Sequence, residues 1–298
     1  LCANYANPFT GTLCAPDDGK KHPAMVLLGG SEGGNSMAGF AKRFAEHGYV
    51  AASVAYFKMP GLPQMLVDVP VETILPAIAT LQSRADVKAD KIGILGISKG
   101  GEFALLAAST YPQIKAVVAI VPSPLAYMGL NESDQPEGCS WTRGGKELPC
   151  VPADPTAGMA IGQEIAAQKP ITLTPFYDAA RNADPLVTRK AMFPLEHING
   201  PILCLSGKDD AMWNSSAQCD IAMQYLKAHH HKFADQSDSY PSAGHMFYLA
   251  LNGPSSAMIV YPFPGGAFNF GGTPQGDVDA ATAAWKATWE FLASALGG

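Results

Sequence analysis

The stretch Lys91-Ile-Gly-Ile-Leu-Gly-Ile-Ser-Lys-Gly-Gly-Glu-Phe-Ala-Leu-Leu-Ala-Ala108 joins a short apolar run to a run of good helix formers. Its β-branched first half, residues 92–97, predicts a strand buried on both faces. Its second half, from Glu102 to Ala108, predicts a helix. The turn between them holds Ser98 in a strained conformation, and the glycines two residues before and after it remove side chains that would collide. The stretch therefore predicts a strand, a sharp turn and a helix, with Ser98 lifted clear of a sheet.

Ser98 stands at the centre of a Gly-x-Ser-x-Gly pattern, which is typical of a nucleophilic serine. There its hydroxyl can attack a carbonyl carbon, and the backbone N–H of Lys99 can face the oxyanion that develops. The alternative is a chance pattern, because the chain contains 30 glycines. The strand before the pattern, the helix after it and the additional Gly101 favour the nucleophile.

A glycine-rich turn, Gly29-Gly-Ser-Glu-Gly-Gly34, follows a second buried-strand pattern at 23–28. The turn lacks the Gly-Lys-Ser/Thr of a phosphate-binding loop. In serine hydrolases a turn of this kind supplies the second N–H that binds the oxyanion. We expect that donor at Ser31, and the alternative is a tight turn that binds nothing.

Strand and helix patterns alternate along most of the chain. Within the helix predicted at 67–83, Pro70 falls in or near the first turn and Pro76 at a kink. This alternation, without internal repeat or linker, predicts a single α/β domain over residues 1–298, with a mostly parallel central sheet and helices on both faces. The other strands are predicted at 9–14, 49–57, 116–121, 201–206 and 237–240, and the other helices at 37–48, 215–228 and 278–296.

The alternation stops between residues 122 and 197, where Pro and Gly are frequent and apolar residues are scattered. A long irregular insertion in a compact domain is usually functional, so we expect a cap over the site. The alternative is a disordered excursion. Apolar and aromatic residues within 124–195 suit an acyl chain, whereas six basic residues against eight acidic ones do not suit the phosphates of coenzyme A.

The composition favours a globular protein with a large core, since 47% of the 298 residues are hydrophobic and 15% are charged. With a net charge of −6 and no Lys/Arg cluster, nucleic acid and anionic membranes are not expected partners. No run approaches the length of a membrane span. No cofactor is expected, and the pattern does not predict an oligomeric state.

The six cysteines predict two disulfides, Cys139–Cys150 and, in a second loop-like stretch, Cys2–Cys14. Cys204 and Cys219 fall on a buried strand and a helix, where free thiols are expected. The sequence contains no Cys-x-x-Cys pair, which would indicate a zinc site, so no metal is expected. Disulfides, together with a first residue, Leu1, that is not Met, predict a periplasmic or secreted protein; six reduced cysteines in a cytoplasmic protein are the alternative.

An attacking hydroxyl needs a base, and the base needs an acid that orients it. In α/β-hydrolases these residues follow in the order Ser, Asp or Glu, His, each in a loop after a strand. Asp210 follows the strand that ends at Ser206, with Asp209 as the alternate acid, and His245 follows the next strand. The sequence therefore predicts the catalytic set Ser98, Asp210 and His245. The other histidines precede their expected place or stand at a helix end.

Several stretches occur together in this chain: Gly29 to Gly34, Ala55-Tyr-Phe57, Gly96-Ile-Ser-Lys-Gly-Gly-Glu102, Pro201 to Gly207 with Asp209-Asp-Ala-Met-Trp213, and Gly244-His245. From about Pro23 to Leu296 the chain resembles the C-terminal catalytic domain of the acyl-CoA thioesterase and bile acid-CoA:amino acid N-acyltransferase family. That family is a dienelactone-hydrolase-like group of the α/β-hydrolase superfamily. The resemblance implies Ser98 as nucleophile, Asp210 as acid and His245 as base, with Trp213 as a structural neighbour.

The resemblance has two departures. Animal members carry an N-terminal β-sandwich, whereas only about twenty residues precede the hydrolase pattern here. Members that conjugate amino acids use Cys where this chain has Ser98. We therefore expect hydrolysis of a small-molecule acyl thioester or ester through an acyl-enzyme on Ser98. The alternatives are a carboxylesterase or peptidase-like hydrolase for another acyl compound, an acyl transferase, or a binding protein that reuses the fold.

Overall fold

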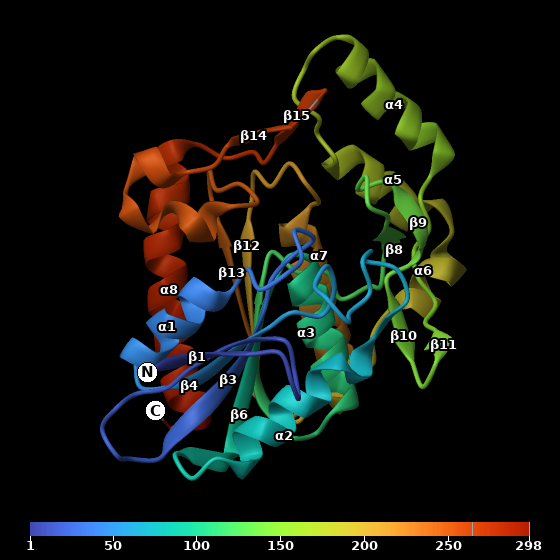
Figure 1. Cartoon of the computed structure of the whole chain (residues 1–298). Coiled ribbons are helices and arrows are strands. Elements are labelled where there is room, and N and C mark those ends of the chain that lie inside the picture. Colours follow the sequence, from blue (N-terminus) through green and yellow to red (C-terminus); the bar gives the residue numbers. More distant parts are fainter. Residues whose placement is uncertain (264, 298) are drawn as a thin grey trace.

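An eight-stranded sheet runs through the computed structural model, which describes residues 1–263 and 265–297 (Figure 1). From β4 to β13 all neighbouring strands are parallel, whereas β1 pairs antiparallel with β2, and β2 antiparallel with β4. The order across the sheet is β1 (Cys2–Tyr5), β2 (Gly11–Cys14), β4 (Val50–Val54), β3 (His22–Leu28), β6 (Val87–Ile97), β7 (Ile114–Ile120), β12 (Ile202–Gly207) and β13 (Gln236–Tyr240).

Helices cover both faces of this sheet. One face packs against α1 (Ala38–Glu46) and α8 (Pro274–Leu296) through a core that includes Phe44 and Trp285. The other face packs against α2 (Leu75–Ser83), α3 (Lys99–Thr110) and α7 (Ser215–Ala228). The central strands are apolar on both sides because both sides are covered. The predicted α/β fold with a mostly parallel sheet is confirmed.

The helix predicted at 67–83 begins later than expected. Residues 67–74 instead contain the two-residue strand β5 (Val69–Pro70) and the 3₁₀-helix η1 (Val71–Ile74). Pro76 lies in the first turn of α2, where its missing N–H would have had no partner within the helix, so the predicted kink is wrong. The last helix begins four residues before the predicted start, at Pro274, because the Thr273 side chain accepts the Gly276 N–H.

The insertion at 122–197 is more regular than its composition predicted. Asp154 accepts the Ala157 N–H and Asp184 accepts the Leu186 N–H, and each is followed by proline, so both begin helices. Its helices are α4 (Pro155–Ala166), α5 (Thr174–Ala183), α6 (Pro185–Ala191) and the 3₁₀-helix η2 (Leu195–His197). Its strands are β8 (Met128–Leu130), β9 (Pro136–Cys139), β10 (Trp141–Arg143) and β11 (Lys146–Glu147).

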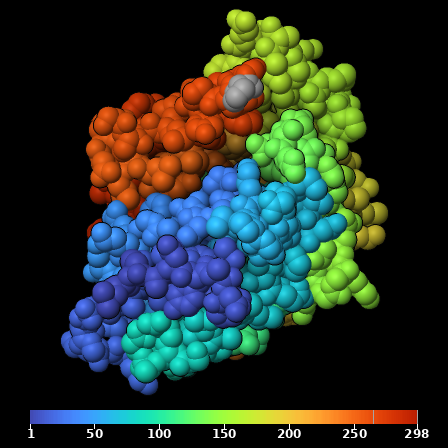
Figure 2. Space-filling view, in the orientation of Figure 1, coloured from blue at the N-terminus to red at the C-terminus, as the bar shows by residue number. Residues whose placement is uncertain are grey.

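A hairpin from the C-terminal part of the chain meets this insertion. The hairpin consists of β14 (Val260–Phe263) and β15 (Gly266–Asn269), and Ile171 exchanges backbone hydrogen bonds with Ala267 and Asn269. In Figure 2 the orange hairpin segment lies against the yellow-green insertion. Two 3₁₀-helices, η3 (Phe247–Asn252) and η4 (Pro254–Ser256), precede the hairpin.

The cysteines lie as predicted. Cys2 is disulfide-bonded to Cys14 across β1 and β2, and Cys139 is bonded to Cys150 at the root of the insertion. Cys204 and Cys219 are buried free thiols. Among the described residues, no helix has both the length and the apolar character that crossing a bilayer would require.

Candidate active site

The turn from β6 into α3 places Ser98 at the carboxyl edge of the sheet. Ser98 has a φ of 55°, in the left-handed region. A Cβ on Gly96 would lie 1.9 Å from the carbonyl oxygen of Gly100, and one on Gly100 would lie 2.1 Å from that of Gly29. Both glycines are therefore required for the turn, as the pattern predicted, although the second makes room for the neighbouring loop rather than for Gly96.

Three side chains from separate loops form one chain of hydrogen bonds. The Nε2 atom of His245 lies 2.9 Å from the Oγ atom of Ser98. On the other side of the ring, Nδ1 lies 2.8 Å from Oδ2 of Asp210. His245 and Asp210 are 4% and 6% exposed, so water does not compete for the bond between them. The three residues predicted from their order along the chain therefore meet in space.

The structure distinguishes the two neighbouring aspartates. Oδ1 of Asp210 accepts the backbone N–H groups of Met212 and Trp213, at 2.9 and 3.2 Å, which leaves Oδ2 for the histidine. Asp209 is exposed, and the histidine lies against the carboxylate of Asp210 instead. Trp213 packs edge-on beside the His245 ring, with 6.2 Å between the ring centroids, as expected of a structural neighbour.

Two backbone N–H groups lie beside Ser98. Lys99 is the first residue of α3, and Ser31 follows Gly30, where a Cβ would lie 3.3 Å from the Cβ of Ser98. Within residues 1–263 and 265–297 neither N–H donates a hydrogen bond. The loop that carries Ser31 is held by Tyr56, whose hydroxyl donates to the carbonyl of Gly29 at 2.6 Å. Both N–H groups therefore lack a partner among the described residues, and their role as oxyanion donors stays a prediction.

Comparison with known proteins decides the family. Residues 69–298 match the family described as BAAT / acyl-CoA thioester hydrolase, C terminal. The chain belongs to this family. Acyl-coenzyme A thioesterase 6 and acyl-coenzyme A thioesterase 1 of Mus musculus are 29% and 30% identical to it, each over 96% of this chain. The chain spans 63% of the length of each of these two relatives.

Solved structures place the family member in the α/β-hydrolase fold. The α/β-hydrolase GrgF from Penicillium sp. sh18 superposes with a TM-score of 0.56, at 14% identity, over 100% of this chain and 98% of that one. A dienelactone hydrolase-like promiscuous phosphotriesterase from metagenomic libraries gives a TM-score of 0.53, at 15% identity, over 95% and 91% of the two chains. The predicted α/β-hydrolase fold is thus confirmed.

The loop that carries His245 is supported by residues that sequence analysis missed. The His245 N–H donates to the carbonyl of Phe270 at 2.7 Å, and the Gly244 N–H donates to Oδ1 of Asp277 at 2.8 Å. Asp277 lies in the first turns of α8 and is fully buried, and its Oδ2 has no partner among the described residues. The sequence signal for this support was the pair Gly271-Gly272, which indicates a turn with positive φ. Both residues adopt a φ of 76° beside the histidine loop.

Asp277 gives the fold a pH dependence with a definite sign. Burial raises its pKa from 3.8 to about 6, against the opposing effect of the Gly244 N–H. Between these two values the folded protein binds more protons than the unfolded one, so the contribution of Asp277 to the free energy of unfolding falls as the pH rises.

The side chain in Asp277→Asn does not titrate. We therefore expect the free energy of unfolding of this variant, relative to that of the wild type, to rise by about 2 kcal/mol between pH 4 and pH 7. Urea unfolding of both proteins at pH 4, 5, 6 and 7 measures this difference. Parallel pH curves for the two proteins would contradict the assignment to Asp277.

A cavity of about 260 Å³ borders the Ser31 side of the site. Its apolar wall includes Leu66 from the loop after β4 and Leu130 from β8, and its polar rim includes Lys58, Glu132 and Asp134. Of the apolar and aromatic residues of the insertion that we expected to suit an acyl chain, Leu130 lines this cavity, whereas the aromatic side chains of 124–195 do not. Those side chains pack on one another and on Trp213 in a separate core that includes Tyr127, Phe176 and Tyr177.

Proposed function

We propose that this protein is a serine hydrolase that cleaves acyl thioesters or esters through an acyl-enzyme on Ser98. The observation that carries the proposal is the unbroken line of hydrogen bonds from Ser98 through His245 to Asp210. Membership of a thioester hydrolase family supports thioesters as the substrate class. The relatives are longer than this chain, so their substrates are carried over as part of the proposal.

The geometry supports a two-step reaction. Nε2 of His245 takes the proton of Ser98 Oγ as Oγ attacks the acyl carbonyl carbon, and the N–H groups of Lys99 and Ser31 bind the resulting oxyanion. When the intermediate collapses, the C–S or C–O bond breaks and His245 returns the proton to the leaving thiol or alcohol. Water, deprotonated by His245, then cleaves the Ser98 ester and releases the carboxylic acid. The buried Asp210 stabilises the imidazolium in both steps.

Hydrolysis is favoured over acyl transfer because the acyl-enzyme of Ser98 is an ordinary oxygen ester, which a histidine-activated water can cleave. The conjugating members of the family use cysteine at this position, as noted above. A carboxylesterase or peptidase-like activity on an unrelated acyl compound is the second candidate. It is supported by the mixed polar and apolar lining of the cavity beside Ser31.

We further propose that the substrate has a small or medium acyl group and that coenzyme A itself is weakly recognised. Leu66 and Leu130 can bury acyl carbons, at about 0.8 kcal/mol for each methylene. The rim carries Glu132 and Asp134 against one Lys58, which disfavours a tetraanionic nucleotide.

A panel of p-nitrophenyl esters and acyl-CoAs of graded length tests this substrate assignment. We expect kcat/KM to rise with acyl length until the cavity is full. We also expect a ratio below about tenfold between an acyl-CoA and the same acyl group on a small thiol. A ratio of hundreds in favour of the CoA ester would show that the nucleotide is bound and would refute weak recognition of coenzyme A. A flat length profile would refute the acyl site.

We also propose that the protein acts in the periplasm or is secreted, on the ground that its two disulfides persist in oxidising compartments. Peptide mapping without reduction, on protein isolated from its native cells, is expected to recover the 2–14 and 139–150 pairs as cross-linked peptides. Free thiols at all four positions would contradict this proposal and favour the cytoplasm.

A further inference from the structure

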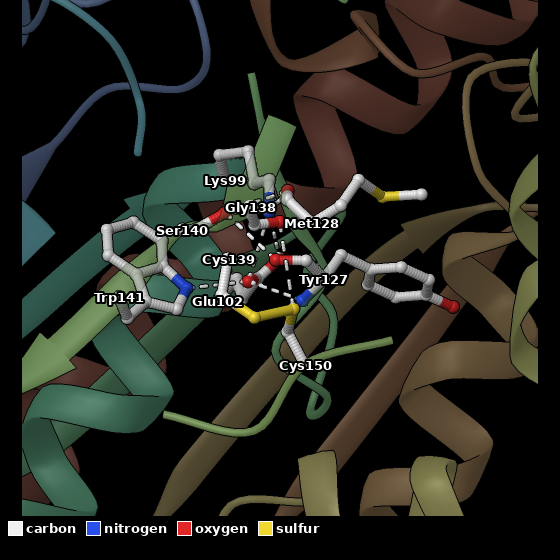
Figure 3. The surroundings of a disulfide bond; sticks show 9 residues. All are labelled: Lys99, Glu102, Tyr127, Met128, Gly138, Cys139, Ser140, Trp141 and Cys150. Carbon is white, nitrogen blue, oxygen red and sulfur yellow. Dashed lines mark hydrogen bonds and ion pairs between the residues drawn. A yellow bond between two sulfur atoms is a disulfide. The ribbon is translucent and has the colours of Figure 1, made fainter. Parts of the chain in front are cut away.

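A buried ion pair begins at Lys99, the residue that follows the proposed nucleophile in the chain. Lys99 Nζ contacts both carboxylate oxygens of Glu102, at 3.0 and 3.1 Å, one turn along α3 (Figure 3). The two side chains are 3% and 0% exposed. The catalytic scheme above uses only the backbone N–H of Lys99, so it gives this pair no role.

The other hydrogen bonds of both charged groups, among the described residues, are made to residues 127–141 in the first part of the insertion. Lys99 Nζ also donates to Ser140 Oγ at 2.8 Å and to the Met128 carbonyl at 3.3 Å. Glu102 Oε1 accepts the Tyr127 N–H at 3.0 Å and the Trp141 indole N–H at 2.6 Å.

Figure 3 shows these groups converging on the pair, next to the disulfide that joins Cys139 and Cys150. The ion pair is therefore the joint between the helix that begins after Ser98 and the insertion.

Such a joint is costly for stability. Burial lowers the pKa of Lys99 and raises that of Glu102, so both shifts point toward the neutral forms, and the attraction between the two charges opposes them. Well-packed apolar side chains of similar volume are often as stable as a buried pair or more so. A pair kept at this place is better explained by the geometry it imposes than by stability.

The geometry links two walls of the site through one residue. The backbone N–H of Lys99 is a proposed oxyanion donor, and its side chain holds the first residue of β8. The last residue of β8, Leu130, lines the cavity beside Ser31. Because β8 is three residues long, a displacement at Met128 moves Leu130 as well.

We propose that Lys99 and Glu102 are a positioning pair that sets the acyl-binding wall of β8 at a fixed distance from the oxyanion donors, and so determines acyl-length specificity. This inference rests on the proposed function. It predicts that weakening the contacts between the ion pair and the insertion lowers kcat/KM more for substrates whose acyl group reaches Leu130 than for shorter ones.

The experiment compares octanoyl and acetyl p-nitrophenyl esters on two variants. Ser140→Ala keeps both charges and removes the hydroxyl that accepts from Lys99 and donates to the carbonyls of Tyr127 and Met128. Lys99→Met/Glu102→Gln removes the charges and keeps an acceptor for the N–H groups of Tyr127 and Trp141. We expect kcat/KM to fall on the order of tenfold more for octanoyl than for acetyl in each variant, since a displacement of about 1 Å is enough for such a loss. Thermal unfolding, followed by circular dichroism, establishes that each variant is folded at the assay temperature.

Lys286→Met/Glu290→Gln is the matched control, because it removes an ion pair of the same residue types from an exposed face of α8. It is expected to keep the wild-type octanoyl-to-acetyl ratio. An unchanged ratio in the folded joint variants, whether activity is retained or lost equally on both esters, would overturn the inference and leave a merely structural pair. A wild-type protein without serine-dependent activity would overturn the proposed function together with it.

Discussion

Replacing Ser98 with alanine is expected to lower kcat/KM by about 10⁴-fold to 10⁶-fold, because no acyl-enzyme can form without the hydroxyl. The free energy of unfolding should change little, because Ser98 is half-buried and its Oγ makes one hydrogen bond, to His245. Steady-state rates on a p-nitrophenyl ester measure the loss. A fluorophosphonate probe is expected to label the wild type on Ser98 and to leave the variant unlabelled.

Ser109→Ala is the matched control for this experiment. Ser109 lies in α3, the helix that begins directly after Ser98, and its hydroxyl donates to the carbonyl of Leu106 in that helix. The control should keep wild-type activity and labelling. Substantial turnover by a folded Ser98→Ala protein would refute the serine mechanism, and the activity would then need another nucleophile.

Asp210→Asn is the second large effect that we expect, on the order of 10⁴-fold in kcat. The amide oxygen can still accept the N–H groups of Met212 and Trp213, which places the amide NH₂ against Nδ1 of His245. Nδ1 must then act as acceptor, so Nε2 carries the proton and cannot take one from Ser98. The fold is retained, but the histidine is in the wrong tautomer.

The neighbouring Asp209→Asn provides the control, because that side chain is exposed and the histidine contacts Asp210 instead. It is expected to change kcat by less than about threefold. The pH dependence of kcat, measured for both variants, separates a lost base from a lost fold. A larger loss in Asp209→Asn than in Asp210→Asn would show that the acid has been misassigned.

The proposed catalytic residues could be predicted from the sequence because each one follows a strand of a parallel sheet. The carboxyl ends of parallel strands meet at one edge of the sheet. The order Ser98, Asp210, His245 was therefore enough to predict that the three side chains lie close together. The supporting residues could not be found in this way. Phe270 and Asp277 reach the histidine loop from a segment whose glycine-rich composition predicts only a loop.

The role of Lys99 shows a second limit. Its position after Ser98 predicts a backbone donor and gives no indication of where the charged side chain lies, although lysine side chains are mostly exposed. The structure buries that charge because Ser140 and Met128, about 40 and 30 positions away, supply polar partners that no local pattern reveals. The helices of the insertion were missed for a related reason, since frequent Pro and Gly outweighed the capping aspartates Asp154 and Asp184.

The dispersal of the site along the chain also bears on how the protein acquires activity as it folds. Ser98 and His245 are separated by 147 positions, and the histidine loop is held in turn by Asp277 from the last helix. Contacts this distant in sequence form slowly, because the loop-closure entropy must be overcome before they stabilise anything. Helices and local strand pairs can form while the hydroxyl and the imidazole are still apart. We therefore expect the proposed activity to appear late in folding, when α8 docks. A variant truncated before residue 277 is expected to lack the bond that Asp277 makes to the histidine loop, even if its sheet is complete.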